Sequence, residues 1–427
     1  MLFDSPPKNW QISTLGEICQ EGGGDIQTGP FGSQLHASDY VFSGIPSIMP
    51  ANIKDGRVSE EGIARIAEED AKRLSKYLTK AGDIVYSRRG DVERCALIRK
   101  REEGWLCGTG CLRVRPGSGV VDPDFCSHFL SHPETKEWIS RHAVGATMPN
   151  LNTQILSALP VLLPSLQEQK AIAHILGTLD NKIELNRKTN ETLEAMAKAL
   201  FKSWFVDFDP VRAKAEGRPT GLPAEISDLF PDSFEDSELG EIPSGWCVST
   251  IGEKIKWNHG KTWEAHLRVE DSTITALGSN GIMGKSALEM GCDRIVVMGN
   301  RGSCGALNDF SGAYWVSNNA YYITEKENTY FEYWRQVLRS IDFAPFIGGS
   351  SNPFMPLKNF AHICVICPPD SMLRHFSQGG ATIRGKIERI DQESAFLSQI
   401  RDALLPKLIS GEIRIPDAEK MLEEMLT

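Results

Sequence analysis

Asp124, Glu134 and Lys136 are the residues of this 427-residue chain whose types and spacing come nearest to a hydrolytic centre. Two carboxylates could hold Mg²⁺, and the lysine could help to activate a water molecule, as metal-dependent cleavage of nucleic acid requires. In nucleases of this kind the acids usually sit on adjoining strands. Here the apolar positions Phe125, Phe129 and Leu130 have helical spacing instead. A standalone metal-dependent nuclease therefore stays an alternative rather than the favoured interpretation.

Two other catalytic patterns are incomplete. Gly284-Lys285-Ser286 lacks the glycine that a phosphate-binding loop needs five positions before Gly284, where Ser279 stands. Because the backbone amides of such a loop must converge on the phosphates, this spacing does not form the cradle. Asn352-Pro353-Phe354 lacks the second proline of a DNA methyltransferase site, and no Gly-rich loop joins a strand to a helix in the required way. We therefore expect no methyl-transfer activity in this chain alone.

The cysteines and histidines do not predict a metal site. Cys107 and Cys111 have no clear second pair, which structural zinc usually requires. The nine histidines form no zinc-protease or deaminase pattern. We expect Cys107 and Cys111, like Cys95 upstream, to be buried structural residues. We also expect the chain to bind no metal or cofactor of its own and not to be an enzyme by itself.

Arginine, asparagine and small polar residues gather in Gly-rich loops, and these are the side-chain types that contact base edges and phosphates. Arg88-Arg89-Gly90, for example, places two guanidinium groups beside a flexible glycine. Each loop could equally be a solvated turn. The candidate DNA-binding residues are Phe31, Ser33, Gln34, Arg88, Arg89, Thr147, Asn150, Asn152, Lys261, Asn280, Asn300, Arg301, Asn318, Asn319, Ser351 and Asn352.

These loops belong to a sequence that contains an internal repeat. Pro7-x-x-Trp10-x-x-Ser13-Thr14-Leu15-Gly16-Glu17 recurs as Pro243-x-x-Trp246-x-x-Ser249-Thr250-Ile251-Gly252-Glu253. Further matches follow in the same order, among them Arg89-Gly90 with Arg301-Gly302 and Met148-Pro149 with Met355-Pro356. The number of residues that separates the two members of a matched pair falls along the repeat. This fall predicts about thirty extra residues in the front part of the first copy. A collinear repeat of this kind predicts two similar structural units.

Each copy has a front part and a back helix. The front parts, 1–164 and 241–369, mix short β-type runs with many Gly and Asn residues, which is typical of α+β domains with long loops. The back segments, 165–206 and 370–412, repeat apolar residues every seven positions, which predicts long helices that pair along a seam. Gly379 and Gly380 are expected to delay the start of the second helix. The predicted seam contains Ile172, Leu179, Asn186, Leu193, Leu200, Ile383, Ile390, Leu397 and Leu404.

The net charge of −10 is concentrated in two segments. Residues 207–240 hold nine acids and three bases, and residues 412–427 hold five acids and two bases. We interpret 207–240 as an acidic linker and 413–427 as a C-terminal tail, because proline, glycine and like charge disfavour packing. The remainder is nearly neutral, so composition permits DNA binding without demonstrating it.

Composition also indicates in which cellular compartment the protein is expected. No stretch approaches the ~18 uncharged apolar residues of a membrane span. The first residues lack a basic start followed by an apolar run, and ten scattered cysteines do not suggest a disulfide scaffold. We expect a cytoplasmic protein that does not contact a membrane.

Several segments resemble the specificity subunit of type I restriction-modification systems. They are Gly29-Pro30-Phe31-Gly32-Ser33-Gln34-Leu35, Pro164-Ser165-Leu166-Gln167-Glu168-Gln169 with Ile172, Ser203 to Val211, Leu239-Gly240-Glu241-Ile242-Pro243 with Gly245-Trp246, and Arg401 to Ile413. The resemblance covers essentially the whole chain in order. The second copy departs from it by keeping only Pro368-Pro369 at the start of its helix, without the Glu-Gln that follows in the first copy.

The resemblance implies an α+β fold with two target recognition domains joined by two long antiparallel coiled-coil helices. Each domain would read one half of a bipartite, asymmetric sequence in double-stranded DNA. Two methylation subunits would bind this chain to form an adenine-N6 methyltransferase, and restriction subunits would add an endonuclease. S-adenosylmethionine, ATP and Mg²⁺ would then belong to the partner subunits.

Overall fold

The computed structural model describes residues 7–145, 148–349 and 352–426. The chain divides into two compact units. The first contains residues 1–186 and 391–427, and the second contains residues 187–390. Each unit therefore holds one front part together with segments of both back helices.

The first front domain is α+β, as predicted, and begins its core at Trp10. Its strands are β1 (Gln11–Thr14), β2 (Asp25–Thr28), β3 (Tyr40–Val41), β4 (Ile45–Ile48), β5 (Ile53–Lys54), β6 (Arg57–Val58), β7 (Ala64–Ile66), β8 (Ile84–Ser87), β9 (Cys95–Leu97), β10 (Leu106–Cys107), β11 (Cys111–Arg115) and β12 (Pro160–Leu163). Its α-helices are α1 (Leu15–Glu21), α2 (Glu68–Arg73), α3 (Pro123–Ser131), α4 (Pro133–His142) and α5 (Thr153–Ser157), and its 3-10 helices are η1 (Ala37–Asp39), η2 (Pro50–Asn52), η3 (Ser75–Tyr77) and η4 (Lys100–Glu102).

The second front domain is smaller and uses the same kinds of element. Its strands are β15 (Cys247–Thr250), β16 (Asn258–His259), β17 (Arg268–Val269), β18 (Thr275–Gly278), β19 (Gly281–Ser286), β20 (Ile295–Gly299), β21 (Leu307–Phe310), β22 (Tyr314–Val316), β23 (Ala320–Thr324) and β24 (Cys364–Cys367). Its helices are α9 (Ile251–Lys254), α10 (Phe331–Ser340) and α11 (Leu357–Phe360), with η5 (Ala265–Leu267) and η6 (Ala344–Phe346).

The sequence repeat is also a repeat of sheet topology. The order β2-β11-β8-β9 in the first domain corresponds to β16-β23-β20-β21 in the second, and β10-β4-β7-β3 corresponds to β22-β18-β19-β17. Even the single parallel pairing in these sheets recurs, as β10 with β4 and β18 with β22. The hairpin β5–β6 and helix α2 lie in the region where the first copy was expected to carry extra residues.

The most exact sequence match of the repeat has a local physical cause. Thr14 Oγ1 accepts a hydrogen bond from the Glu17 amide at 3.3 Å, and the Glu17 carboxylate accepts one from the Thr14 amide at 2.8 Å. Thr250 and Glu253 form the same reciprocal cap at the start of α9. This capping box satisfies amides at a helix start that would otherwise lack partners.

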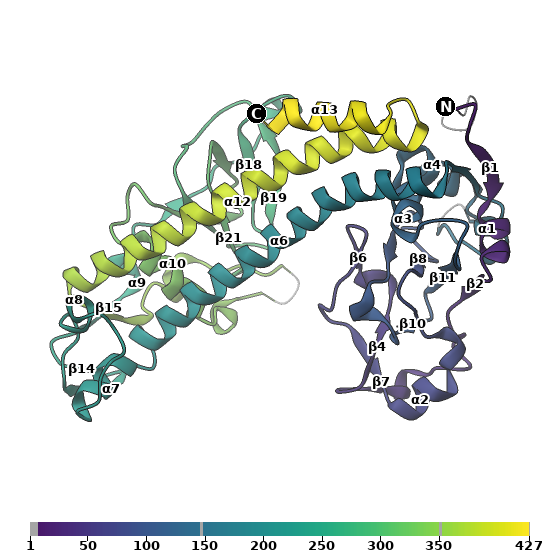
Figure 1. Cartoon of the computed structure of the whole chain (residues 1–427). Helices are drawn as coiled ribbons and strands as arrows, with labels where there is room; N and C mark the ends of the chain where they lie inside the picture. The colour runs from purple at the N-terminus through teal and green to yellow at the C-terminus, as the bar shows by residue number, and fades with distance from the viewer. Residues whose placement is uncertain (1–6, 146–147, 350–351, 427) are drawn as a thin grey trace. The chain divides into compact units, whose positions relative to one another are not determined.

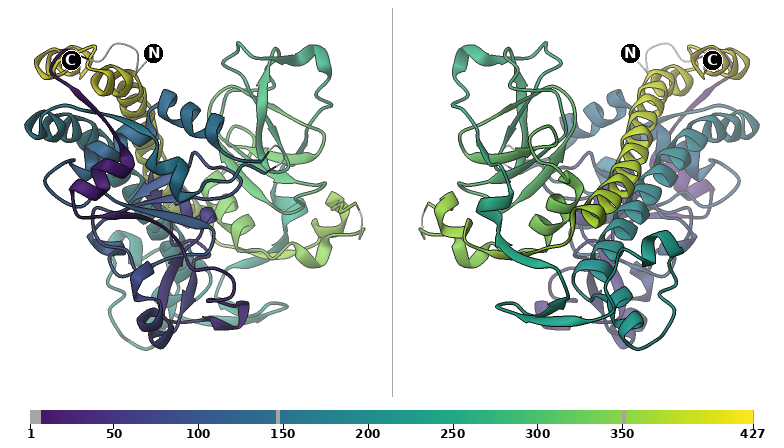
Figure 2. Two further views of the ribbon diagram at one scale, coloured as in Figure 1. Left: turned by 90° about the vertical axis from the view of Figure 1, so that its right-hand side faces the viewer. Right: turned by 90° about the vertical axis from the view of Figure 1, so that its left-hand side faces the viewer.

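The two back helices are long and unbroken (Figure 1, Figure 2). They are α6 (Leu166–Phe205) and α12 (Asp370–Ser410). At ~1.5 Å per residue each is about 60 Å long. Gln169, which is 1% exposed, connects α6 to the first front domain: its side chain donates to Pro164 O at 2.9 Å and accepts from the Asp122 amide at 2.8 Å.

The helices pair antiparallel along the predicted seam. In the first unit, Asn186 on α6 donates to Glu393 Oε2 at 2.9 Å and to Ser394 Oγ at 3.2 Å on α12. Ile172, Leu179, Asn186, Leu397 and Leu404 are buried, whereas Leu193, Leu200, Ile383 and Ile390 are half-buried. Because Asn186 is 4% exposed, its polar side chain would be unsatisfied in a shifted register, so it specifies the pairing.

The segment 207–240 is not the loose tether that its composition suggested. It contains α7 (Asp209–Ala215), α8 (Ala224–Ser227) and the hairpin β13 (Phe234–Ser237) with β14 (Gly240–Pro243). Phe208, Val211 and Phe230 are buried, and the ring centroids of Phe230 and Trp204 lie 5.2 Å apart. The burial of these apolar residues in the core of the second unit therefore folds a segment that is acidic in composition.

The C-terminal segment is also folded. Helix α13 (Ile415–Leu426) occupies most of the predicted tail and buries Ala418 against the core of the first unit. Arg414, just before this helix, forms an ion pair of 3.0 Å with Glu168 at the start of α6.

The expectation that Gly379 and Gly380 delay the second helix is wrong. Helix α12 begins at Asp370 and continues through both glycines. A Cβ at position 380 would lie 2.9 Å from the Cβ of Glu332 on α10, whereas a Cβ at 379 would meet nothing within 4 Å. Tertiary packing therefore overrides the low helix propensity of glycine at position 380, because only glycine lets α10 approach α12 this closely.

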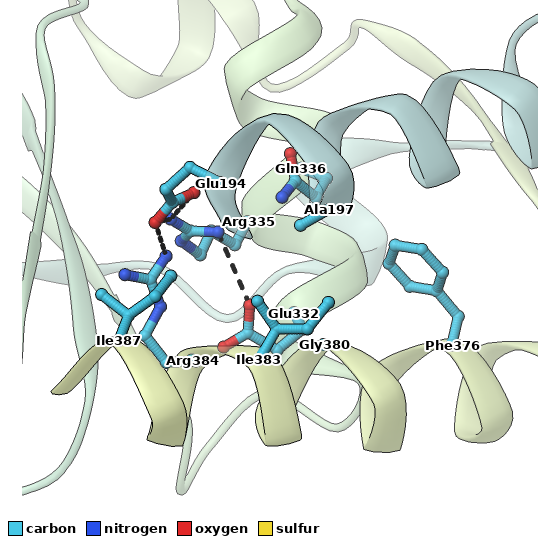
Figure 3. A pocket seen from close by; sticks show the side chains of 10 residues that line it. All are labelled: Glu194, Ala197, Glu332, Arg335, Gln336, Phe376, Gly380, Ile383, Arg384 and Ile387. Atoms are coloured by element: carbon cyan, nitrogen blue, oxygen red, sulfur yellow. Dashed lines mark hydrogen bonds and ion pairs between the residues drawn. The ribbon is translucent and has the colours of Figure 1, made fainter. Parts of the chain in front are cut away.

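An ionic cluster forms at this contact, and Figure 3 shows all of its members except Asp309. We use that name for Glu194 on α6, Asp309 on β21, Glu332 and Arg335 on α10, and Arg384 on α12. Arg335 Nη2 lies 2.5 Å from Asp309 and 3.1 Å from Glu194, and Arg384 Nη2 lies 2.7 Å from Glu194. The Arg335 side chain is 3% exposed, so these charges replace water as its partners. The cluster fastens the second front domain to both helices within its unit.

Glu332 is the least satisfied member of the ionic cluster. Its side chain is 5% exposed, one carboxylate oxygen has no hydrogen-bond partner among the described residues, and the nearest Arg335 nitrogen is 3.6 Å away. Burial raises the pKa of Glu332 to about 7, against the opposing effect of the Arg335 charge. The folded chain therefore binds this proton more tightly than the unfolded chain does.

The two adjacent glycines give a matched test of the packing at α10. We expect Gly380→Ala to lower the free energy of unfolding by about 1–3 kcal/mol through overpacking against Glu332. Gly379→Ala should raise it by up to ~1 kcal/mol, since alanine is the better helix former and the site is open. Denaturant unfolding of both variants measures the difference. Equal changes in the free energy of unfolding for the two variants would contradict the close approach of α10 to α12 at Gly380.

The pKa of Glu332 predicts a pH dependence of stability. Its contribution to the free energy of unfolding is complete below about pH 4.5 and is lost as the pH rises to about 7. Glu332→Gln should remove this dependence and stabilise the chain above pH 7 by up to roughly 3 kcal/mol, at ~1.4 kcal/mol per pKa unit. Unfolding curves at pH 5, 6, 7 and 8 measure the slope, with the exposed Glu289→Gln as control. Parallel pH profiles for Glu332→Gln and the unaltered chain would refute it.

Candidate nucleic-acid interface

Two loops of the first front domain are joined edge to edge where the β8 strand ends. The Gly90 amide donates to Pro149 O at 3.1 Å, and the Leu151 amide donates to Arg88 O at 2.9 Å. Val144 and Asn150 exchange a pair of backbone hydrogen bonds, which closes the second loop on itself. We call the described residues of segments 87–91 and 144–151 the first loop bracket.

The second front domain builds the same arrangement after β20. The Gly302 amide donates to Pro353 O at 3.2 Å, and the Met355 amide donates to Asn300 O at 2.9 Å. Gly348 and Phe354 exchange the pair of hydrogen bonds that Val144 and Asn150 exchange in the first domain. The described residues of 299–303 and 348–355 are the second loop bracket.

Glycine is required at the matching turns of both brackets. Gly90 and Gly302 have φ of 76° and 71°, and Gly145 and Gly349 have φ of 113° and 83°. These left-handed conformations are strained for other residues. They reverse the chain immediately after Arg89 and Arg301, so both arginine side chains stand at exposed loop tips.

The bracket arginines differ from most arginines of this chain, which form ion pairs. Among the residues that the structure describes, no ion pair joins Arg88, Arg89 or Arg301 to a carboxylate. Instead, the Arg301 guanidinium carbon lies 4.8 Å from the ring centroid of Phe354, and that of Arg88 lies 5.9 Å from the ring of Phe31. Guanidinium groups stacked in this way keep their N–H donors available for a ligand.

The loop that carries Phe31 is held in place by its own residues. Gln34 Oε1 accepts hydrogen bonds from the Phe31 amide at 3.1 Å and from Tyr77 Oη at 2.8 Å, so Gln34 supports the loop from inside. Phe31 and Ser33 are exposed. The aromatic ring, which is 54% exposed, is thus presented to solvent beside Arg88.

In the second domain, the candidate residues meet at one end of the sheets. Gly299, at the end of β20, approaches the turn that contains Ser279 and Asn280: a Cβ on this glycine would lie 2.8 Å from Ser279 O. The Asn300 amide donates to Asn319 O at 2.9 Å in the β22–β23 turn, and Lys261 bridges to Ser317 in the same turn. Lys261, Asn280, Asn318 and Arg301 are all exposed.

Other candidate DNA-binding residues are buried, bound within the fold or only partly exposed. The Asn300 side chain is 2% exposed, so it does not face solvent. Asn152 caps α5 by accepting a hydrogen bond from the Ile155 amide at 2.8 Å, although its side chain is exposed. Asn150 is half-buried and Asn352 is exposed. Thr147 and Ser351 lie outside the described residues.

The sequence argument missed Phe354 and Met148. Phe354 is 37% exposed and Met148 is 62% exposed, each in the second segment of its bracket. In the sequence, Asn352-Pro353-Phe354 suggests only an incomplete methyltransferase motif. The sequence match of Met148-Pro149 with Met355-Pro356 is wrong by three residues, because the backbone hydrogen bonds make Pro149 equivalent to Pro353 and Leu151 equivalent to Met355.

Tyr321 holds the chain in place immediately after the second loop bracket. Its hydroxyl accepts a hydrogen bond from the Leu357 amide at 3.0 Å, just after the bracket. Burial raises the pKa of Tyr321, while the bond from Leu357 and the charge of Arg301 oppose that shift. The hydroxyl is therefore a neutral structural partner at physiological pH.

Asp124 and Lys285, which the sequence offers for catalysis, take part in other contacts. Asp124 and Glu134 lie on helices α3 and α4 rather than on adjoining strands, and Asp124 bonds Arg99 at 2.5 Å. Lys285 lies in strand β19 and donates to Thr275 Oγ1 at 3.4 Å, not in a phosphate-binding loop.

Cys107 and Cys111 are buried, and burial raises the pKa of both thiols. Within the described ranges, no three His, Cys, Asp or Glu residues are grouped to hold a metal ion. None of the described helices is long and apolar enough to cross a membrane.

Comparison with known proteins agrees with this geometry. A model of the family described as the type I restriction modification DNA specificity domain matches residues 7–195. The MjaIX type I restriction enzyme specificity subunit of Methanocaldococcus jannaschii is 24% identical, over 96% of this chain and 95% of its own length. The HindI specificity subunit of Haemophilus influenzae is also 24% identical, over 88% of this chain and 96% of its own length.

The fold has a solved counterpart. The S subunit of a type I restriction-modification system from M. genitalium aligns with a TM-score of 0.58 at 18% identity, covering 96% of this chain and 97% of that one. The nuclease alternative finds no support among these relatives. Residues 7–195 therefore match the type I restriction modification DNA specificity domain, and nearly the whole chain is similar to specificity subunits of type I restriction enzymes.

Proposed function

We propose that this chain reads a bipartite, asymmetric sequence in double-stranded DNA, with one half-site for each front domain. The observation that carries the proposal is the loop bracket, which is built twice with the same backbone hydrogen bonds. One chain thus has two equivalent scaffolds for base contacts, as a split target requires.

The side chains on the two scaffolds differ, and this difference favours an asymmetric target. The first bracket presents Arg88 and Arg89 beside Asn150, whereas the second presents Arg301 beside Phe354. Because base edges are discriminated by the donors, acceptors and apolar groups that face them, unlike side chains select unlike sequences.

Catalysis belongs to partner subunits in this proposal. Two methylation subunits would bind the chain and supply S-adenosylmethionine-dependent adenine-N6 methylation, and restriction subunits would supply ATP- and Mg²⁺-dependent cleavage. The near neutrality of the chain outside its acidic segments fits this division, since partners can then provide part of the phosphate contacts. A cytoplasmic location is part of the same proposal.

Long-read mapping of adenine methylation in host DNA tests this function directly. We expect a split methylation motif in cells that carry the gene and its absence when the gene is deleted. Restoring the gene should restore the motif. If no motif depends on the gene, the proposal fails for this chain, and capture of partner subunits would show whether a methylation complex forms at all.

Reciprocal arginine variants test the assignment of half-sites to domains. Arg89→Ala should weaken recognition of one half-site and Arg301→Ala that of the other, each by about 1–3 kcal/mol if the arginine grips a guanine. Competition binding of the complete complex to duplexes altered in one half-site measures this. Weakening of the same half-site by both variants would contradict one reader per domain.

A further inference from the structure

We propose that each front domain reads a guanine of its half-site with an arginine stacked on a phenylalanine, Arg301 with Phe354 in the second domain and Arg88 with Phe31 in the first. The phenylalanine ring aligns the guanidinium and itself packs against the neighbouring nucleotide. The inference rests on the proposed function and specifies which side chains carry it.

The backbone fixes the Arg301–Phe354 pair. These residues face each other in an antiparallel β-bridge, and the flanking bonds Gly302 to Pro353 and Met355 to Asn300 hold the bridge on both sides. Residues directly opposite in an antiparallel pair project to the same face, so the ring and the guanidinium are set beside each other at 4.8 Å. A guanidinium held in this way loses little freedom when it binds a base edge.

The exposure of Phe354 is unlike that of its neighbours. Met355 and Phe360 are fully buried, whereas the Phe354 ring is 37% exposed at the edge of the bracket. An apolar ring kept in contact with water gains from burial against a ligand. A base, a thymine methyl group or a deoxyribose offers the flat apolar surface that such a ring fits.

The first domain assembles the same chemistry from a different loop. Phe31 comes from the segment before β3 rather than from the bracket, yet its ring lies under Arg88 at 5.9 Å and is 54% exposed. The Arg88 Nε is buried without a hydrogen-bond partner among the described residues. The other guanidinium nitrogens are therefore the ones directed to a ligand. The recurrence of the pair, despite its different origin, points to a shared task.

Guanine is the base whose edge matches a guanidinium group. Its O6 and N7 acceptors lie side by side in the major groove and accept two parallel N–H donors. A phosphate would accept the same donors but would give no preference for sequence. The two outcomes can therefore be separated by changing the base alone.

The domain contains a matched control pair outside the bracket. The Arg268 guanidinium lies 5.1 Å from the Trp263 ring, but its Nη2 donates to Trp263 O at 3.2 Å. Arg268 therefore has the same kind of ring contact, the same charge and an exposed position, without the bracket. It should not discriminate between bases.

The experiment uses the complete chain bound to its methylation subunits and the target found by methylation mapping. Each guanine of the target is replaced in turn by 7-deazaguanine, which lacks the N7 acceptor. We expect the unaltered complex to lose about 5- to 100-fold in affinity at one guanine in each half-site. Arg301→Ala should lose a similar factor on the natural duplex and become insensitive to that one substitution, and Arg88→Ala should do the same in the other half-site.

Further variants separate the parts of the pair. Arg301→Lys should retain the charge but lose most of the discrimination, since lysine cannot form the paired bond. Phe354→Leu should weaken cognate binding about 3- to 10-fold, and Arg268→Ala should stay within about twofold of the unaltered complex. Because Arg301, Phe354 and Arg268 are exposed, unchanged melting temperatures should accompany each variant.

Three results would overturn the inference. The first is a half-site that contains no guanine. The second is an unaltered complex whose affinity does not change with any 7-deazaguanine substitution. The third is an Arg301→Ala complex whose affinity falls equally for all duplexes, as loss of a phosphate contact would cause. Failure of the proposed function would look different, because the unaltered complex would then prefer no sequence at all.

Discussion

Antiparallel pairing of α6 and α12 is the interaction on which both halves of this protein depend. Each compact unit contains segments of both helices, so neither front domain has a complete core without them. Apolar heptad residues supply the attraction, but apolar side chains alone would tolerate a shifted register. Asn186 with Glu393 and Ser394 in the first unit, and Glu194 with Arg384 in the second, give the pairing a single alignment.

Arginine has two separate roles in this chain. Arg335 and Arg384 are buried among carboxylates and connect a domain to the helices, where removal of one partner would leave an uncompensated charge. Arg88, Arg89 and Arg301 stand at loop tips with no carboxylate partner among the described residues. The first group stabilises the fold, and the second remains available to a polyanionic ligand. An overall acidic charge is therefore compatible with DNA recognition, because the position and pairing of the cations decide it.

In the two loop brackets, a shared backbone arrangement presents different side chains to a ligand. Backbone hydrogen bonds and left-handed glycines, which do not depend on the neighbouring side chains, define the loops in both domains. The side chains at equivalent positions are free to differ, as Asn150 and Phe354 do. This separation of backbone from side chain allows one architecture to recognise two unlike half-sites, provided that the supporting glycines and prolines are kept.

Patterns that are local in sequence determined much of this structure. The α+β front domains, the heptad seam and the capping boxes of Thr14 and Thr250 each depend on residues a few positions apart, whose spacing the sequence displays directly. The repeat is visible because such local patterns occur twice in the same order. Tertiary structure decided what depends on distant partners. Gly380 lies within a helix because α10 must approach it, the acidic segment 207–240 folds because Phe208 and Phe230 find a core, and Asn300 faces inward while Arg301 faces out. Phe354 pairs with Arg301 across 53 positions of the chain, a separation over which sequence periodicity carries no information, so only the folded chain brings ring and guanidinium together.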